Sequence, residues 1–166
     1  MGRALSVMLV GSFVIVGGAG RARAQWGPEL PMSATGADVW GDGLAATGTT
    51  VHVVWGTGEV RYQRSDDEGA TWSAPRRIDG GTLHLTDPIV ADGDDVWVLE
   101  LENLQSRTDW CCSRELGDLY LLHSADRGQT WQPARRLTTS RGAYRVSIAH
   151  SAGRLHLVWM DYRRGA

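Results

Sequence analysis

Two octapeptides in this 166-residue chain place the same polar and aromatic residues at the same spacing. The first is SDDEGATW, Ser65–Trp72, and the second is SADRGQTW, Ser124–Trp131. Carboxylate and hydroxyl groups this close together could bind a cation, but the octets lack the series of oxygen ligands that an EF-hand calcium loop supplies. The same side chains suit a turn better, because aspartate and serine accept hydrogen bonds from nearby backbone N–H groups.

Each recurring residue of the octets has a place in such a turn. The serine and the aspartate close it, the glycine supplies a positive φ, and the tryptophan opens the returning strand and buries a large apolar side chain. We therefore expect a role in folding, rather than in catalysis, for Ser65, Asp67, Gly69, Thr71, Trp72, Ser124, Asp126, Gly128, Thr130 and Trp131.

The octets belong to a longer internal repeat. The apolar runs VHVVW, VWVLE and LHLVW begin at Val51, Val96 and Leu155, and Val96 follows Trp72 at the same spacing at which Leu155 follows Trp131. One polar insertion, NLQSRTDWCCSREL, explains why the second repeat is longer than the first. The runs are rich in β-branched and aromatic residues and are separated by turn signals. Short antiparallel strands that recur in this way are typical of propeller blades.

The pattern Ser-x-Asp-x-Gly-x-Thr-Trp resembles the Asp-box, or bacterial neuraminidase repeat, of sialidases and many other secreted propellers. Both copies match every defining position, and the repeat extends the resemblance from about Leu44 to the end. The resemblance implies an all-β, six-bladed, sialidase-like Asp-box β-propeller, in which the box joins the third and fourth strands of a blade on the side away from the active site. We expect blade 1 at about 43–79, blade 2 at about 86–139 and the start of blade 3 at about 144–166.

Only about two and a half blades are therefore expected. By the spacing of the first unit, the third octet would begin at about position 169. Propellers close with about 4–8 blades, and each blade needs neighbours to cover its apolar faces. We expect the remaining blades to come from a longer chain, and the fragment alone to be inactive and to self-associate or dissolve poorly through exposed strand edges.

The resemblance also suggests catalytic residues. Exo-sialidases clamp the substrate carboxylate with three arginines and use an aspartate acid/base and a tyrosine nucleophile activated by a glutamate, which suits an oxocarbenium-like transition state. Asp87, in an Asp-Pro pair shortly after the first octet, is similar to the acid/base of the family and is the candidate catalytic residue. Arg145, one residue before the repeat equivalent of Asp87, is the candidate substrate-binding residue.

Two observations leave a non-catalytic function open. A polar residue before proline also opens strands in non-catalytic repeats. Residues 26–50 contain no arginine and nothing similar to the Arg-Ile-Pro signature of the first clamp arginine. The sequence thus predicts a secreted, sialidase-like propeller that binds glycans or glycoconjugates and acts on terminal sugars, or a non-catalytic Asp-box propeller that is a binding or scaffold module for proteins or glycans. A third class is an assembly factor that grips a protein partner.

One carboxylate departs from the repeat. Glu100 takes the place that Trp55 and Trp159 hold in the other two units. We expect a solvated edge position for it, and a rim loop containing Trp110 in the insertion that begins at Asn103.

The segment Met1–Ala24 is typical of a secretory signal. Met1–Arg3 is a basic start, Ala4–Gly20 is apolar and uncharged, and Ala22–Ala24 offers a small-x-small cleavage site. A membrane anchor is the alternative, but the apolar run is short for a bilayer span and rich in glycine. We expect cleavage after Ala24, a mature domain at 25–166 that is secreted, periplasmic or on the cell surface, and no membrane attachment after cleavage.

Composition argues against several further classes. The chain has no lysine and a formal net charge of −2 at pH 7, so it has no electrostatic reason to bind nucleic acid or an anionic membrane. Cys111 and Cys112 are adjacent, which leaves a vicinal disulfide, a free pair or a link to another chain open. No histidine pair near them completes a zinc pattern, and we expect no metal and no cofactor.

Overall fold

The computed structural model describes residues 9–10, 13–16, 23–26, 29–33, 39–56, 59–78, 84–108 and 113–162. Every regular element in this part is a β-strand, and its residues include no helix long and apolar enough to cross a membrane. The chain divides into two units, Met1–Val39 and Trp40–Ala166. The prediction of an all-β protein is confirmed for the described residues.

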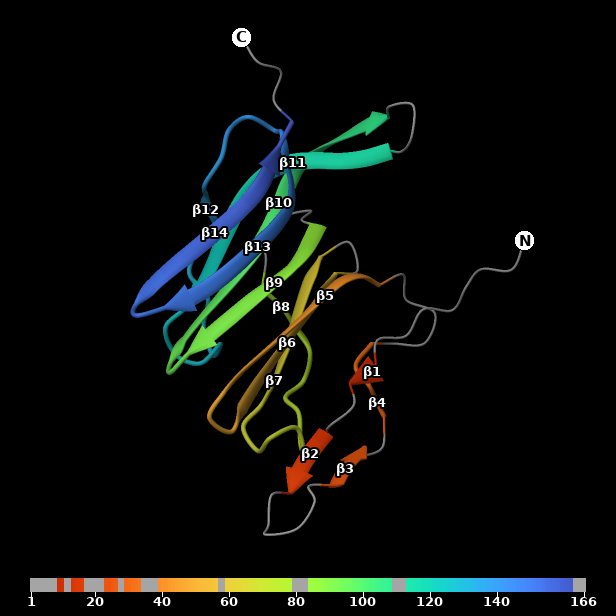
Figure 1. Ribbon diagram of the computed structural model, residues 1–166, viewed down its shortest axis with the longest axis vertical. Helices are drawn as coiled ribbons and strands as arrows, with labels where there is room; N and C mark the ends of the chain where they lie inside the picture. Colours follow the sequence, from red (N-terminus) through yellow and green to blue (C-terminus); the bar gives the residue numbers. More distant parts are fainter. Residues whose placement is uncertain are drawn as a thin grey trace, which may run out of the picture. The chain divides into compact units, whose positions relative to one another are not determined.

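The first unit contains two short antiparallel strand pairs (Figure 1). One joins β1 (Leu9–Val10) to β4 (Leu30–Pro31), and the other joins β2 (Phe13–Val16) to β3 (Arg23–Trp26). The predicted cleavage after Ala24 falls within β3, and the signal sequence stays a prediction.

The second unit begins with a four-stranded antiparallel sheet, whose strands follow one another in chain order. They are β5 (Trp40–Thr47), β6 (Thr50–Gly56), β7 (Val60–Ser65) and β8 (Arg76–Arg77). The apolar run predicted as a strand is β6, which pairs with β5 on one side and with β7 on the other. Thr50, Val53 and Val54 of this central strand are buried, and Val51 is half-buried.

The same order of strands then recurs. The second copy consists of β9 (His84–Asp92), β10 (Asp95–Thr108), β11 (Ser113–Ser124) and β12 (Arg135–Arg136). The chain goes on into the hairpin of β13 (Ala143–Ser151) and β14 (Arg154–Asp161), which joins the second sheet through a single pair of residues, Gly117 and Ala143.

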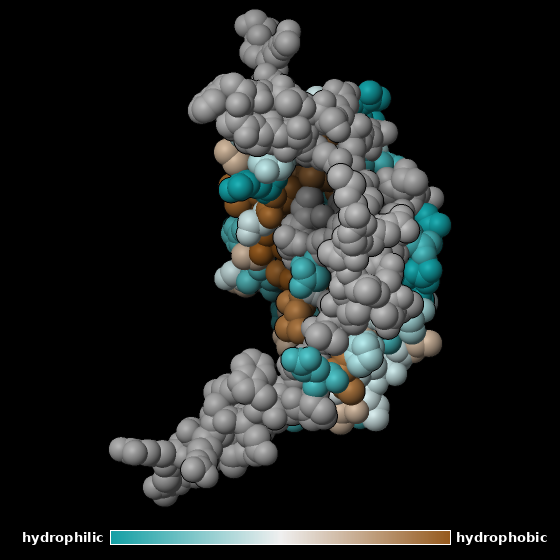
Figure 2. All heavy atoms as spheres, turned by 90° about the vertical axis from the view of Figure 1, so that its right-hand side faces the viewer, coloured by the Kyte–Doolittle hydropathy of each residue, from teal (hydrophilic) through white to brown (hydrophobic). Residues whose placement is uncertain are grey.

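An apolar core lies between the first and second sheets. It consists of Val54, Val60, Tyr62, Ile78, Ile89, Val96, Val98 and Leu122. A smaller cluster of Leu101, Leu119 and Ala143, with Val146 beside it, packs the second sheet against β13. Several large apolar side chains remain exposed, and Figure 2 shows apolar residues that reach the surface in a band bordered by polar ones.

Glu100 is fully buried, and the expectation of a solvated edge position was wrong. Its strand, β10, is flanked by β9 and β11 and lies in a sheet with neighbours on both faces, so no side chain at this position reaches water.

The insertion that begins at Asn103 lengthens two strands. Its described residues continue β10 and β11 as an antiparallel hairpin arm, with a change of register between Glu102 and Gln105. Figure 1 shows this arm extending beyond the rest of the second sheet. Trp110, Cys111 and Cys112 lie outside the described residues.

An ion pair recurs at the outer strands. Arg77 Nη1 lies 3.4 Å from Glu59 Oε2, and Arg136 Nη2 lies 2.6 Å from the buried Asp118 Oδ2. Glu59 and Arg77 hold the same positions in the first unit that Asp118 and Arg136 hold in the second. Asp118 also accepts a hydrogen bond from the backbone N–H of Arg141, which holds the segment leading to β13 against β11.

Candidate functional site

The first octet forms a closed turn between β7 and β8. Ser65 Oγ accepts a hydrogen bond from the Gly69 N–H at 2.7 Å and donates one to Asp67 Oδ1 at 2.7 Å. Asp67 in turn accepts hydrogen bonds from the backbone N–H and the hydroxyl of Thr71, at 2.8 and 2.7 Å. Trp72 Nε1 donates to the Gly69 carbonyl at 3.0 Å. The recurring side chains thus bond to one another and to their own turn.

The second octet, between β11 and β12, repeats the Ser-Asp-Gly-Thr network. Ser124 Oγ donates a hydrogen bond to Asp126 and accepts one from the Gly128 N–H. Asp126 accepts hydrogen bonds from the N–H and the hydroxyl of Thr130. The tryptophan differs, because Trp131 Nε1 has no hydrogen-bond partner among the described residues. Its ring packs edge-on against Tyr62 of the first sheet, with ring centroids 5.2 Å apart.

The networks favour ionised aspartates. Hydrogen bonds from the Thr71 hydroxyl and N–H lower the pKa of Asp67 from 3.8 to about 2, and the matching bonds from Thr130 hold the pKa of Asp126 well below its usual range. The unfolded chain binds a proton at each carboxylate first as the pH falls, so the stabilisation present above about pH 4 is lost as the pH falls toward 2.

Replacing Asp67 and Asp126 with asparagine should therefore flatten the dependence of stability on pH between about 4 and 2. Urea unfolding of the double variant at several pH values in this window measures the effect. Glu68→Gln, an exposed neighbour whose side chain is outside the network, is the matched control and should keep the slope of the wild type. An unchanged slope in the double variant would contradict a stabilising role of the ionised pair.

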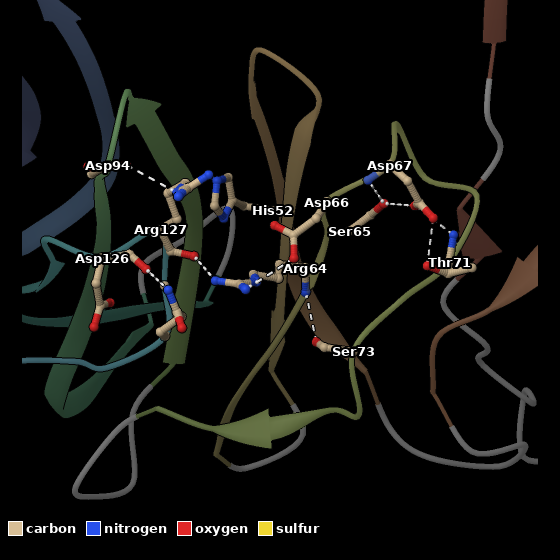
Figure 3. Close-up of polar contacts among 12 residues, drawn as sticks. His52, Arg64, Ser65, Asp66, Asp67, Thr71, Ser73, Asp94, Asp126 and Arg127 are labelled. Atoms are coloured by element: carbon tan, nitrogen blue, oxygen red, sulfur yellow. Dashed lines mark hydrogen bonds and ion pairs between the residues drawn. The ribbon is translucent and has the colours of Figure 1, made fainter.

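The two octets are also linked through Arg64 (Figure 3). Arg64 Nη1 donates to the Arg127 carbonyl at 2.9 Å, and Arg64 Nη2 lies 3.1 Å from Asp66 Oδ2. Tyr62 Oη lies 2.7 Å from His52 Nδ1 and donates to the same Arg127 carbonyl at 3.3 Å. The second octet thus rests on side chains of the first sheet.

The octets mark one end of the sheets. The backbone N–H of Glu68 donates to the Thr49 carbonyl in the turn between β5 and β6, and Arg127 N–H donates likewise to Asp94 in the turn between β9 and β10. The first strands β5, β9 and β13, which lie side by side, end near these turns (Figure 1). Their opening residues are therefore at the opposite end from the octets.

All three first strands change register near their openings. The register shifts at Gly41 in β5, at residues 86–88 in β9 and at Arg145 in β13. Gly41, Thr86 and Arg145 are equivalent positions of the repeat. Such bulges re-aim side chains and are common beside functional sites.

Arg145 is the most distinctive of these residues. It has a φ of 47°, in the left-handed region that non-glycine residues rarely adopt. The side chain is exposed, and its Cζ lies 5.6 Å from the centre of the Tyr144 ring. The guanidinium is thus held over an aromatic face and open to a ligand.

The backbone places Asp87 in β9, at the same end as Arg145 in the neighbouring β13. The side chain of Asp87 lies outside the described residues. Asp42, an exposed residue that takes the position of Asp87 in the first unit, was not among the predicted residues. The spacing of the repeat could have found it. The octet residues, in contrast, lie at the other end and are not part of this group.

A groove of about 600 Å³ lies along the same strands near the octet end, away from Arg145. It is lined by residues 44–46, 89–92 and 150–153.

Beside this groove, Trp97 stacks between His123 and His150, with ring centroids 5.4 and 5.1 Å away. Asp95 Oδ1 lies 2.6 Å from His123 Nε2, and Asp92 Oδ2 lies 3.2 Å from His150 Nδ1. The stack joins β10, β11 and β13, and adds a further anchor for the β13–β14 hairpin.

Among the residues that the structure describes, no three His, Cys, Asp or Glu side chains are grouped so that they could hold a metal ion.

No protein-family model and no curated protein matches the chain. Among solved structures, a xylan β-1,4-xylosidase from Bacillus halodurans C-125 is similar over 75% of this chain, with a TM-score of 0.47 and 16% identity. The match covers 26% of that enzyme, so this chain spans about a quarter of its length.

Proposed function

We propose that this chain is part of a secreted, sialidase-like Asp-box β-propeller that binds a glycan at the openings of its inner strands, β5, β9 and β13. In this proposal Arg145 contacts the ligand and Asp87 is the acid/base that acts on the glycosidic oxygen. The octets are the Asp-boxes and close the opposite side. The remaining blades come from a longer chain.

The conformation of Arg145 supports the proposal most. A positive φ costs a non-glycine residue of order 1–3 kcal/mol, and such strain gathers at ligand sites. Arginine also binds carboxylates through two parallel hydrogen bonds, which suits an acidic sugar. Arg145 is strained and exposed, and it lies one residue before the position in β13 that corresponds to Asp87 in the neighbouring β9. It is therefore well placed to hold a substrate carboxylate beside an acid/base.

The test uses the complete protein with all its blades and a fluorogenic sialoside. Asp87→Ala should lower kcat about 100-fold, because a general acid contributes about 10²–10⁴ in rate. Arg145→Ala should raise KM about 10-fold through the lost charge-assisted hydrogen bonds. Asp66→Ala and Arg135→Ala, exposed residues away from the inner strands, are the matched controls. Equal turnover by the wild type and Asp87→Ala would remove Asp87 from the mechanism.

The second candidate function is a non-catalytic glycan- or protein-binding module, favoured by the missing Arg-Ile-Pro signature in residues 26–50. In that case the wild type should bind sialylated glycans in a titration without hydrolysing them. Arg145→Ala should then weaken binding about 10-fold, and Asp87→Ala should leave it unchanged.

A further inference from the structure

We propose that the cleft between the first sheet and the second octet binds a tetrahedral oxyanion, such as phosphate or sulfate, through Arg64 and Arg76. The cleft lies at the octet end, opposite the strand openings at which the glycan function is proposed. The proposal is therefore independent of that function, and every residue it needs belongs to the first two units.

The cleft is a small cavity of about 280 Å³ between two units of the repeat. Its lining includes Tyr62, Arg64, Ser73 and Arg76 of the first unit and Gly128 and Gln129 of the second octet. Clefts that bind drug-sized ligands are typically about 300–1,000 Å³ in volume and mostly apolar. This cleft is smaller and is lined mainly by polar and charged groups, so it suits a small ion.

Both arginines are held in place by the second octet. Arg64 Nη1 donates a hydrogen bond to the Arg127 carbonyl at 2.9 Å. Arg76 Nη1 donates one to the Gln129 carbonyl, so the two bonds flank Gly128. Figure 3 shows the first bond, with Arg64 extending from β7 toward Arg127. Guanidinium groups fixed in this way lose little conformational freedom when an anion binds, which favours affinity.

The charge of Arg76 is not balanced by a carboxylate. Arg64 Nη2 lies 3.1 Å from Asp66 Oδ2, whereas Arg76 forms no ion pair with any residue that the structure describes. Its Cζ lies 5.5 Å from the centre of the Tyr62 ring, and its Nη2 atom is buried without a hydrogen-bond partner among the same residues. Buried N–H groups are nearly always hydrogen-bonded, and buried charges are normally paired. The wall of the cleft thus contains a charged donor that an anion would satisfy.

Tyr62 reports the sign of the electrostatic potential in the cleft. Burial raises the pKa of its hydroxyl well above the usual value, so the group stays neutral. The charges of Arg64 and Arg76 act to lower this pKa. Each of them has a larger effect on it than either nearby carboxylate, Asp66 or Asp126. The potential at the lining is therefore positive, which attracts anions.

Ser73 adds a neutral donor beside the two arginines. Its Oγ accepts a hydrogen bond from the Arg64 backbone N–H at 3.1 Å, which leaves the hydroxyl proton for an acceptor in the cleft. The guanidinium fork matches the spacing of the oxygens of phosphate and of carboxylate groups. Donors on three separate residues favour an anion whose oxygens point in more than two directions. A tetrahedral oxyanion meets this condition, whereas a planar carboxylate does not.

The second unit does not repeat this pair of arginines. His123 takes the position of Arg64, and only Arg135 remains, at the position of Arg76. The fold of the repeat therefore does not require two arginines here, and the pair belongs to a single interface. Arg135 is the natural control for Arg76, because it has the same place in its own unit.

Isothermal titration calorimetry of inorganic phosphate into the 166-residue chain tests the proposal, with chloride adjusted to keep the ionic strength constant. We expect saturable binding. Arg64→Gln and Arg76→Gln should each weaken binding about 10-fold through the lost charge-assisted hydrogen bonds. Arg135→Gln should leave the Kd unchanged. No saturable binding by the wild type, or equal weakening by Arg135→Gln and Arg76→Gln, would overturn the proposal.

Urea unfolding with and without phosphate separates anion binding from a purely structural role of the arginines. An anion that binds only the folded chain raises its stability. Phosphate should therefore raise the urea midpoint of the wild type and of Arg135→Gln alike, and that of Arg76→Gln much less. An equal rise in all three would be the general stabilisation that phosphate gives to proteins, and would contradict a specific site.

The class of ligand is tested on the wild type alone. Acetate should bind about 10-fold more weakly than phosphate, because one planar carboxylate cannot accept from all the donors at once. Acetate that binds as tightly as phosphate would overturn the assignment to a tetrahedral oxyanion. Methyl phosphate distinguishes the two sources of this group. Tighter binding of methyl phosphate than of inorganic phosphate would assign the cleft to an ester, and the reverse order would assign it to the free ion.

Discussion

Replacing Gly128 with alanine should lower the free energy of unfolding by about 2–5 kcal/mol. A Cβ at this position would overlap the Tyr62 hydroxyl and lie 2.5 Å from Tyr62 Cζ, and the φ of 75° adds left-handed strain. Tyr62 cannot move aside cheaply, because His52 holds its hydroxyl and Trp131 packs against its ring. The clash therefore falls on the contact between the second octet and the first sheet.

Gly153→Ala is the matched control for this prediction. Gly153 has a φ of 72°, nearly that of Gly128, but no atom lies within 4 Å of its would-be Cβ. It should lose only the strain, about 1–2 kcal/mol. Urea unfolding of both variants measures the difference. Equal losses would mean that Tyr62 does not pack under the second octet as the structure has it.

The sequence was sufficient to predict the octet turns because each turn is closed by its own residues. Ser65, Asp67 and Thr71 bond to one another, so their spacing alone carries the geometry. The strands of the repeat were predictable for a similar reason, since a short run of β-branched residues between turn signals needs no distant partner to be recognised.

Contacts between the units could not be predicted in this way. Tyr62 reaches an octet 65 positions later in the chain, and nothing in the local pattern VRYQRS distinguishes it from a residue of an ordinary strand. Glu100 was misjudged because its burial depends on sheets that cover both faces of β10. The conformation of Arg145 was also not predictable, because a bulge arises from the pairing of β13 with β14.

The second large effect expected is a loss of stability as the pH falls from about 6.5 to about 4. His52 is fully buried, and burial, with the Arg64 charge adding to it, lowers its pKa from 6.5 to about 4. Asp66 acts in the opposite direction and is the smaller influence. The folded protein keeps His52 neutral in this window, whereas the unfolded chain protonates it. The free energy of unfolding should therefore decrease by about 3 kcal/mol across the window.

Urea unfolding of the wild type and His52→Asn between pH 7 and about pH 4 isolates this effect. The variant loses the bond to Tyr62 Oη and should be less stable at pH 7, but its stability should depend less on pH. His156→Asn, at an exposed histidine of β14, should keep the slope of the wild type. The octet aspartates do not confuse the measurement, because their contribution is lost only below about pH 4. If His52→Asn and the wild type lost stability in parallel, the buried pair of His52 and Tyr62 would not be the origin of the acid sensitivity, and the pH dependence would have to arise at another titratable group.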